Sequence, residues 1–311
     1  MNNTLWLKDI LSTKQLTKQH LEIIFGKAIE MEDILSGKKD GSNILKWKIM
    51  ASLFYEPSTR TRLSFETAMK RLGWEVITVA NEWNTSLSKW ETLEDNAKIN
   101  GIYSDILVMR HPEIGSVERT AKATNKPVIN AWDGSNQHPT QALLDVYTIF
   151  KERWTLENLQ ISIVWDLKYG RTTHSLVFLM GLYKGVSFKF ISPEELKMPE
   201  KVTSFLKENN IHFEETINYK TGITNSDVIY VTRLQKERFS DISEYERLKN
   251  NFILTKDVLN SAHIDVTIMH PLPRVNEVSP EVDTLPNAAF FRQAENGITI
   301  RMALLSILLW K

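Results

Sequence analysis

Residues 56–73 read EPSTRTRLSFETAMKRLG and directly follow the apolar run KIMASLFY at residues 48–55. The apolar run has the composition of a buried strand, and residues 61–72 have the spacing of an amphipathic helix. Between them lies a polar segment with three hydroxyls and two arginines, STRTR at residues 58–62. Because a strand that passes through a turn into a helix is the repeating unit of parallel α/β sheets, this stretch predicts that fold class.

The same alternation continues along the chain. Further strand-like runs are EVITVA (75–80), DILVMR (105–110), KPVIN (126–130), QISIVW (160–165), VSFKFI (186–191), IHFEET (211–216), DVIYV (227–231) and DVTIMH (265–270). Helical patterns lie at 140–150, 172–183, 199–209 and 298–310. These two series predict two similar doubly wound domains with parallel central sheets, joined by interdomain helices. We place the domains at 1–150 and 151–291, with a C-terminal helix at 292–311 that packs back on the first.

Composition excludes several classes of function. The chain has 311 residues, and 38 basic side chains balance 38 acidic ones, so no global field favours nucleic acid or an anionic membrane. No run reaches the roughly 18 apolar residues of a membrane span, and we expect no signal peptide in the first residues. The chain contains no cysteine, which excludes disulfides and cysteine metal sites and fits cytoplasmic residence.

The opening stretch predicts an anion site. Ser58 is placed to cap the helix, whose first-turn N–H groups carry a partial positive charge. The hydroxyls of Thr59 and Thr61 add donors, and Arg60 offers a planar fork to two oxygens. An ordinary capped helix with solvated arginines is the alternative.

Other polar residues also follow strands. Arg110 comes after the third run, and His138 and Gln141 flank the start of a later helix, where both can donate to a carbonyl or phosphoryl oxygen. A single histidine of this kind is often structural, but three clusters at equivalent places favour a site.

In the second half, Arg171 and Arg233 follow two further strands and suit a small dicarboxylate, with surface ion pairs as the alternative. The loop Pro271-Leu272-Pro273 presents backbone carbonyls to an amine or amide.

Seven motifs together resemble the aspartate carbamoyltransferase catalytic chains of the aspartate/ornithine carbamoyltransferase family. They are FYEPSTRTRLSFETA, SLSKWETLEDN, MRHPEIG, DGSNQHPTQALLD, DLKYGRTTHSL, VTRLQKERF and HPLPRVNEV, in order from about residue 5 to 305. The resemblance implies transfer of a carbamoyl group from carbamoyl phosphate to L-aspartate, a step of pyrimidine biosynthesis. It also implies that the anion of the opening stretch is the phosphate, and that residues 1–150 bind carbamoyl phosphate and residues 151–291 aspartate.

The resemblance also implies residue roles. Carbamoyl phosphate would be bound by Ser58, Thr59, Arg60, Thr61, Arg110, His138, Gln141 and the carbonyls of Pro271 and Leu272. Aspartate would be bound by Lys89, Arg171, Arg233 and Gln235. The catalytic residues among these would be Arg60, Thr61, Lys89, Arg110 and His138.

Assembly is implied as well. In this family the loop of Lys89 reaches the active site of a neighbouring subunit, which implies a homotrimer with shared sites, and a regulatory chain is a further possible partner. Glu56 would pair with arginines across the domain interface. No metal or organic cofactor is needed, because fixed donors and cations stabilise the transition state and the departing phosphate can accept the amine proton.

Three alternatives fit less well. Ornithine carbamoyltransferases have a loop that resembles HCLP where this chain has HPLPR. They would also need an acidic pocket for the amine side chain of ornithine, which Arg233 and Arg274 do not provide. A nicotinamide dehydrogenase would need a G-x-G-x-x-G after a first strand, which is absent. A non-catalytic scaffold would not need to retain the charged residues above.

The tryptophans depart from the family pattern. Trp47, Trp74, Trp90, Trp132 and Trp165 stand where the family commonly has glycine or another small residue, and Trp154 resembles them. The chain has only 12 glycines, against roughly 22 at about 7% usage, and 9 tryptophans. One hypothesis is that UGA codons for glycine are read as tryptophan; the other is that the enzyme has repacked around the rings.

Overall fold

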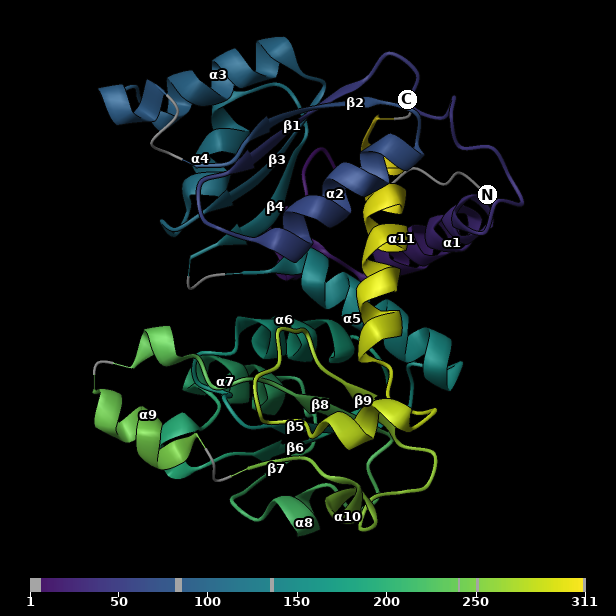
Figure 1. Cartoon of the computed structure of the whole chain (residues 1–311), viewed down its shortest axis with the longest axis vertical. Helices are drawn as coiled ribbons and strands as arrows, with labels where there is room; N and C mark the ends of the chain where they lie inside the picture. The colour runs from purple at the N-terminus through teal and green to yellow at the C-terminus, as the bar shows by residue number, and fades with distance from the viewer. Residues whose placement is uncertain (1–6, 82–85, 135–136, 240, 250–251, 310–311) are drawn as a thin grey trace. The chain divides into compact units, whose positions relative to one another are not determined.

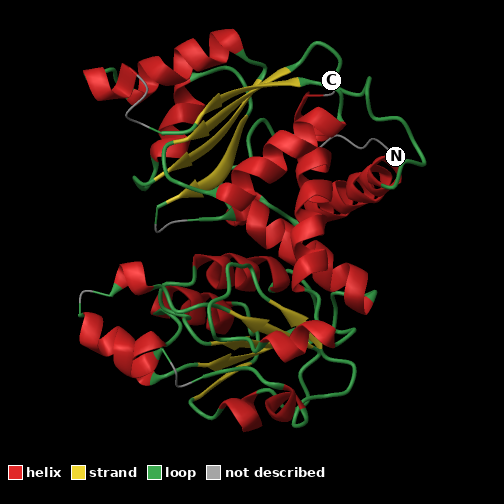
Figure 2. Ribbon diagram, viewed as in Figure 1, coloured by secondary structure: helices red, strands yellow, loops and turns green. Residues whose placement is uncertain are grey.

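The structure is a computed structural model that describes residues 7–81, 86–134, 137–239, 241–249 and 252–309. The chain forms two compact units, one of Met1–Leu143 with Glu295–Lys311 and one of Leu144–Ala294 (Figure 1). Each unit contains one β-sheet with helices beside it, as the colouring of Figure 2 shows. Each unit therefore has its own sheet and its own buried core.

The first unit is built on a four-stranded parallel sheet. Its strands are β1 (Ile49–Phe54), β2 (Glu75–Val79), β3 (Ile106–His111) and β4 (Val128–Asp133), in the order β2-β1-β3-β4. The helices are α1 (Lys18–Leu35), α2 (Thr59–Arg71), α3 (Leu93–Tyr103) and α4 (Ser116–Ala123), with short 3-10 turns η1 (Thr13–Gln15) and η3 (Ser86–Lys89). Helices α3 and α4 lie on one face of the sheet and α2 lies on the other (Figure 1).

The second unit has a five-stranded parallel sheet. Its strands are β5 (Gln160–Val164), β6 (Ser187–Ile191), β7 (Phe213–Thr216), β8 (Val228–Val231) and β9 (Thr267–Met269), in the order β7-β6-β5-β8-β9. The helices are α6 (Arg171–Met180), α7 (Glu200–Glu208), α8 (Tyr219–Gly222), α9 (Ile242–Leu248) and α10 (Lys256–Leu259), with 3-10 turns η4 (Glu194–Leu196), η5 (Lys236–Arg238) and η6 (Pro280–Thr284).

Two helices contain the points where the chain passes from one unit to the other. Helix α5 (Pro139–Arg153) crosses the boundary after Leu143, and α11 (Phe290–Leu309) crosses it before Glu295. Within the first unit, the Arg301 guanidinium of α11 lies 5.0 Å from the centre of the Phe65 ring of α2. The end of the chain thus packs with the first unit.

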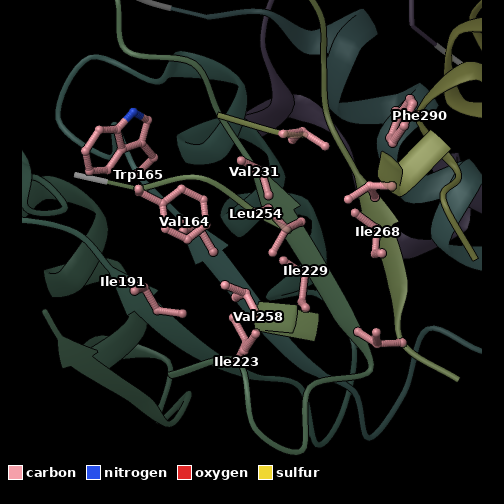
Figure 3. Packing of buried hydrophobic residues seen from close by; sticks show 14 of the residues in the cluster. Val164, Trp165, Ile191, Ile223, Ile229, Val231, Leu254, Val258, Ile268 and Phe290 are labelled. Carbon is pink, nitrogen blue, oxygen red and sulfur yellow. The ribbon is translucent and has the colours of Figure 1, made fainter. Parts of the chain in front are cut away.

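Both faces of the inner strands are buried, since every residue of β8 and all but the first residue of β1 are buried, whereas the edge strands β2 and β7 remain partly exposed. In the second unit, Val164 of β5, Ile229 and Val231 of β8 and Ile268 of β9 belong to one cluster, together with Trp165 (Figure 3). Strands buried on both faces need continuous apolar runs, which is why they are conspicuous in the sequence.

The predicted fold class is confirmed. All nine predicted strands and all five predicted helices are present. The sequence patterns did not predict α1, α3, α4 or the short helices α8, α9 and α10. Helix α3 contains Asn and Gly, which weaken its helical pattern. A local cap sets its start, because the Thr92 side chain accepts a hydrogen bond from the Asp95 N–H at 3.1 Å.

Candidate active site

The predicted anion site lies where β1 passes into α2. Ser58 occupies the N-cap position, but its side chain makes no capping hydrogen bond, which corrects the expectation. Its ψ is 104°, whereas Thr17, Thr92 and Thr255, which do cap helices, have ψ of 166°, 151° and 168°. The first-turn N–H groups of α2 therefore donate no hydrogen bond to the Ser58 side chain and remain suited to an anion.

The side chains of the first turn of α2 differ in exposure. Thr61 is buried, whereas Thr59 and Arg60 are exposed. The buried Thr61 hydroxyl gives the turn a fixed donor, and the exposed side chains of Thr59 and Arg60 can fold over a bound group. This is the arrangement expected of an oxyanion site at a helix N-terminus.

Arg110 reaches the same edge of the sheet from β3. It pairs in register with Phe54 of β1, and the Tyr55 N–H donates to its carbonyl at 2.9 Å. One guanidinium nitrogen lies 3.5 Å from a Glu56 carboxylate oxygen, and the guanidinium carbon lies 4.2 Å from the centre of the Trp132 ring. Burial lowers the pKa of Arg110 and the charge of Glu56 opposes this shift. Glu56 thus contacts Arg110 within the first unit, and its predicted interdomain role stays a prediction.

His138 and Gln141 follow β4, the neighbour of β3. The carbonyl of His138 accepts hydrogen bonds from the N–H groups of Gln141 and Ala142, and Pro139 is the first residue of α5. His138 is buried. Proline fits the first helical position because that residue needs no N–H partner, so this junction is fixed locally.

The residue before His138 is anchored on both sides. The Gln137 N–H donates to Asp133 at 3.1 Å, and its side-chain oxygen accepts from the Thr13 hydroxyl at 2.9 Å. These two hydrogen bonds fix the position of the backbone directly before His138. Since β1, β3 and β4 are parallel neighbours, the opening stretch, Arg110 and His138 all lie at the carboxyl edge of one sheet.

Lys89 lies at the end of η3 and is exposed. Its loop is tied to the sheet by a chain of hydrogen bonds: the Tyr55 hydroxyl donates to Asn96 at 2.8 Å, and the Asn96 amide donates to Glu91 at 2.9 Å. The structure places Lys89 on an anchored surface loop and does not test its predicted role.

In the second unit, Arg171 and Gln235 come together. Arg171 is the first residue of α6 and donates to the side-chain oxygen of Gln235 at 3.4 Å. Arg233 follows β8, two residues before Gln235, and donates to the carbonyl of Leu234 at 3.4 Å. The two arginines thus follow neighbouring strands, β5 and β8, at one edge of the sheet.

Asp166 is a residue of this site that motif reasoning missed. Its two carboxylate oxygens accept hydrogen bonds from the N–H of Tyr169 at 2.9 Å and the N–H of Gln235 at 3.3 Å. One carboxylate therefore holds both arginine-bearing loops. Burial raises its pKa to about 6, although those N–H groups and both arginines act in the opposite direction. An acidic residue directly after a buried strand was the available signal.

The loop of Pro271 and Leu272 depends on a second missed pair. The Leu272 N–H donates to Nδ1 of His270 at 2.8 Å, and Nε2 of His270 lies 2.8 Å from Glu277. Because Nδ1 accepts, the ring is neutral and Nε2–H is the donor to Glu277. Burial lowers the pKa of His270, with Glu277 opposing the shift. This buried pair fixes the loop whose carbonyls were predicted to bind substrate.

Glu277 also accepts hydrogen bonds from the Val275 N–H at 3.1 Å and the Asn276 N–H at 3.1 Å. Burial raises its pKa, but the bond from His270 and backbone bonds that include the Val275 N–H outweigh that effect and leave the pKa below its ordinary value. The carboxylate is therefore satisfied on both oxygens, as a buried charge requires.

Two other kinds of site were searched for in the described part of the chain. No group of three or more His, Cys, Asp or Glu side chains there is arranged to hold a metal ion. No helix there is both long enough and apolar enough to cross a bilayer.

Comparison with known proteins gives the family. The model described as "Aspartate/ornithine carbamoyltransferase, carbamoyl-P binding domain" matches residues 8–151, and "Aspartate/ornithine carbamoyltransferase, Asp/Orn binding domain" matches residues 157–308. The chain belongs to the aspartate/ornithine carbamoyltransferase family.

Several relatives with similar sequences are named aspartate carbamoyltransferase catalytic subunits. The chain is 50% identical over 301 residues to the aspartate carbamoyltransferase catalytic subunit of Leptospira biflexa, covering 96% of each chain. It is 46% identical to that of Methanococcus aeolicus, covering 97% of this chain and 96% of the relative. It is also 48% identical to part of multifunctional protein pyr1-3 of Dictyostelium discoideum. That match includes 98% of this chain but only 14% of the length of pyr1-3.

Solved structures agree in fold. The catalytic subunit of Methanocaldococcus jannaschii aspartate transcarbamoylase superposes with a TM-score of 0.91 at 45% identity, covering 97% of this chain and 98% of that one. Aspartate transcarbamoylase from Trypanosoma cruzi, in complex with carbamoyl phosphate and aspartate, gives a TM-score of 0.89 at 35% identity, covering 96% of each chain.

Proposed function

We propose that the chain is an aspartate carbamoyltransferase, which converts carbamoyl phosphate and L-aspartate to N-carbamoyl-L-aspartate and phosphate in pyrimidine biosynthesis. The observation that carries the proposal is the helix N-terminus of α2, with Thr61 buried in its first turn and Arg110 at the end of the neighbouring strand. Relatives named for this activity, at 46% and 50% identity, support it.

In this proposal the first unit binds carbamoyl phosphate. The N–H groups at the start of α2, the hydroxyls of Ser58 and Thr59, and the guanidinium groups of Arg60 and Arg110 bind the phosphate. All of these groups are donors or cations, so they bind a phosphate dianion more strongly as charge builds on it. The assignment of residues 1–150 and 292–311 to this role belongs to the same proposal.

The carbamoyl group needs orientation and polarisation. Thr61 and His138 donate to its oxygen, while Gln141 and the carbonyls of Pro271 and Leu272 bind its NH₂ group. Donors on the oxygen stabilise the negative charge of the tetrahedral intermediate.

The second unit, residues 151–291 of the sequence, binds aspartate. Arg171 and Arg233 each bind a carboxylate, and Gln235 and Lys89 bind on the same side. Asp166 holds the loops of both arginines through backbone N–H groups. It therefore positions the two arginines without hydrogen-bonding to their guanidinium groups.

The reaction needs no covalent bond between substrate and enzyme. The aspartate nitrogen uses its lone pair to form a bond to the carbamoyl carbon, and the bond from that carbon to the phosphate oxygen then breaks. The proton from the amine passes to the departing phosphate. Binding both charged substrates in one geometry supplies several kcal/mol of the barrier reduction.

An assay with two acceptors tests the function. The purified chain is incubated with carbamoyl phosphate and either L-aspartate or L-ornithine, and both phosphate and the carbamoylated product are measured. We expect equal amounts of phosphate and carbamoyl-aspartate, and no product with ornithine. Product formed from ornithine but not aspartate would contradict the proposal.

We also propose a cytoplasmic homotrimer with shared active sites, in which Lys89 serves the site of a neighbouring subunit. The exposed position of Lys89 and the name "catalytic subunit" carried by relatives support this, and the name also makes a regulatory chain a plausible partner. Glu56 would form ion pairs with arginines of the other domain when substrates bind.

Subunit exchange tests the shared site. Lys89→Ala and His138→Ala trimers are expected to be almost inactive separately. After mixing and exchange, some sites combine an intact Lys89 with an intact His138, so part of the activity should return. No return after verified exchange would place both residues in the same subunit's site.

A further inference from the structure

Most of the described tryptophans have a backbone conformation that favours glycine. The φ values are 67° at Trp47, 70° at Trp90, 135° at Trp132, 59° at Trp154 and 95° at Trp165. Of the six tryptophans in the described ranges, only Trp74 lacks a positive φ.

This distribution is not that of ordinary side chains. Besides these five, the positive-φ residues other than glycine in the described part of the chain are Asn158, Asn210, Asn225 and Leu272. Asparagine tolerates this region because its short polar side chain bonds locally, whereas a bulky residue there is an outlier. With 9 tryptophans in 311 residues, random placement would put fewer than one at these nine positions.

One hydrogen-bond motif occurs four times and allows a direct comparison. In each, the positive-φ residue donates to the carbonyl three residues back, and the next residue donates to the carbonyl five residues back. The residue is Gly37 after α1, Gly73 after α2 and Asn210 after α7, but Trp90 after η3. This is the Schellman motif, whose left-handed residue is usually glycine and sometimes asparagine.

Two further tryptophans occupy turns. Trp154 follows the last residue of α5, and its N–H donates to the carbonyl of Phe150 at 2.8 Å, as in a left-handed helix cap. Trp47 is the third residue of a turn closed by the Lys48 N–H and the Leu45 carbonyl at 3.0 Å. A positive φ at that turn position selects glycine or asparagine.

Packing does not explain the exposed rings. Trp47, Trp90 and Trp154 are 79%, 95% and 77% exposed. An indole gains stability mainly by removing its apolar surface from water, and these three remain in water. They combine a strained backbone with little burial.

The two buried rings lie next to predicted site loops. Trp132 is in a bulge where the pairing of β3 and β4 shifts register, and its ring lies against the Arg110 guanidinium. Trp165 follows β5 (Figure 3), directly before Asp166. Its ring lies 5.8 Å from that of Phe252. Glycine in a strand commonly marks such a bulge or a close backbone approach.

We infer that glycine is the native residue at positions 47, 90, 132, 154 and 165, and that the tryptophans there come from UGA codons translated as tryptophan instead of glycine. Five glycines would also reduce the shortage set by 12 glycines in 311 residues. Trp74 is not included, because its backbone does not require glycine. For that position the hypothesis from the family pattern gains no support from the structure.

The codons test the inference without any assay of function. We expect UGA at all five positions and glycine in the corresponding peptides of protein isolated from its own cells, read by mass spectrometry. UGG at the five positions, or tryptophan in those peptides, would overturn the inference.

Stability measurements test its physical basis. In recombinant protein, Trp47, Trp90 and Trp154 are each replaced by Gly and by Ala, and unfolding is followed in denaturant. Both changes remove the exposed ring, but only Gly removes the cost of a Cβ at positive φ. We expect the folded-to-unfolded ratio to be about fivefold or more higher with Gly than with Ala at each position.

Trp74→Gly and Trp74→Ala are the matched controls, since that backbone has no positive φ. There Gly should be no more stable than Ala. Equal stability of the Gly and Ala variants at positions 47, 90 and 154 would contradict the conformational argument. If the tryptophan-containing chain does not fold, the yield of folded protein from the five-glycine and five-alanine chains provides the same comparison.

A third measurement concerns the site and rests on the proposed function. Trp132→Gly should lower the KM for carbamoyl phosphate, because it removes the ring from the face of Arg110. Trp154→Gly, after a helix end, should leave that KM unchanged. If Trp132→Gly instead weakens carbamoyl phosphate binding at unchanged stability, the ring belongs in the site and glycine is not native there. Failure of the proposed function would leave the codon and stability results unaffected.

Discussion

The candidate sites of the two units are built in different ways. In the first, the start of α2 supplies backbone N–H groups, and four of the predicted side chains are consecutive in sequence, from Ser58 to Thr61. In the second, the predicted residues Arg171 and Gln235 are 64 positions apart and meet through a hydrogen bond. The first arrangement is local in sequence, and the second is produced by tertiary structure.

The difference affects how each site is held. A helix N-terminus is fixed by the helix itself, so its geometry survives many substitutions nearby. Two loops that must present arginines together need a common anchor, and Asp166 provides it through one hydrogen bond to each loop. We therefore expect the first site to depend on the side chains that touch phosphate, and the second also on a residue that touches no substrate.

Arg60→Ala should have the largest effect. It removes a bidentate partner from the phosphate as charge develops, so kcat/KM should fall about 10³-fold or more in the carbamoyl transfer assay. Arg62→Ala is the matched control, because Arg62 lies in the same turn but its guanidinium is 3.9 Å from Glu66. If Arg60→Ala keeps activity within about threefold of the parent, a loss below about 1 kcal/mol, the phosphate assignment is wrong.

Arg233→Ala should act on one substrate. Removing a charge-assisted bond to a carboxylate costs about 1.5–3 kcal/mol, so the KM for aspartate should rise roughly 10- to 100-fold. The KM for carbamoyl phosphate should change by less than about threefold. Steady-state kinetics with each substrate varied in turn provide the measurement. Equal changes in both values would show that Arg233 does not belong to the aspartate side.

Asp166→Asn tests the anchor itself. The amide keeps the size of the side chain but replaces one acceptor oxygen with a donor, so one of the N–H groups of Tyr169 and Gln235 loses its partner. We expect the KM for aspartate to rise roughly tenfold, about 1.4 kcal/mol, with little change for carbamoyl phosphate.

The control for this change is Asp227→Asn. Asp227 also accepts a backbone N–H, from Gln160 at 2.8 Å, but its other partner is Arg153 at 3.0 Å. It should lower stability without a selective effect on aspartate. An unchanged aspartate KM in Asp166→Asn would mean that the arginine loops hold their positions without this carboxylate.

The same contrast explains what the sequence could predict. The strands could be predicted because buried parallel strands are continuous apolar runs, and the residues at strand ends because such ends meet at one edge of a sheet. The order of the strands within each sheet was not predicted. Asp166 could not be predicted in this way, because its partner Gln235 is 69 residues away in the sequence. His270 and Glu277 were missed for a related reason, because their role depends on burial and on which ring nitrogen accepts from Leu272.

Local prediction also had a limit. Ser58 was expected to cap α2 from its residue type and position, yet capping depends on backbone torsions as well. Its ψ of 104° differs from the 151° to 168° of the threonines that cap other helices. The tryptophans show the opposite case: a positive φ at Trp90 follows from the motif around it, and the residue type is what conflicts with the backbone.

The last prediction concerns how pH affects stability through two titratable groups of the second unit. His174 donates through Nε2 to the carbonyl of Leu167 at 2.6 Å, and burial lowers its pKa to about 4. Since the unfolded ring binds a proton from about pH 6.5 downward, folding loses stability as pH falls from about 6.5 to 4. Asp166 has the opposite sign. Its folded pKa of about 6 is above its unfolded value of 3.8, so it adds stability as pH falls from about 6 toward 3.8.

Two substitutions separate these opposing contributions. His174→Gln keeps an N–H donor without a titrating ring, so stability between pH 6.5 and 4.5 should fall less steeply than in the parent. Asp166→Asn removes the compensating group, so it should fall more steeply. Each difference should be on the order of 1–2 kcal/mol over that range, measured by denaturant unfolding at closely spaced pH values. If both variants gave pH curves parallel to that of the parent, neither group would change its pKa on folding, and the prediction would be wrong.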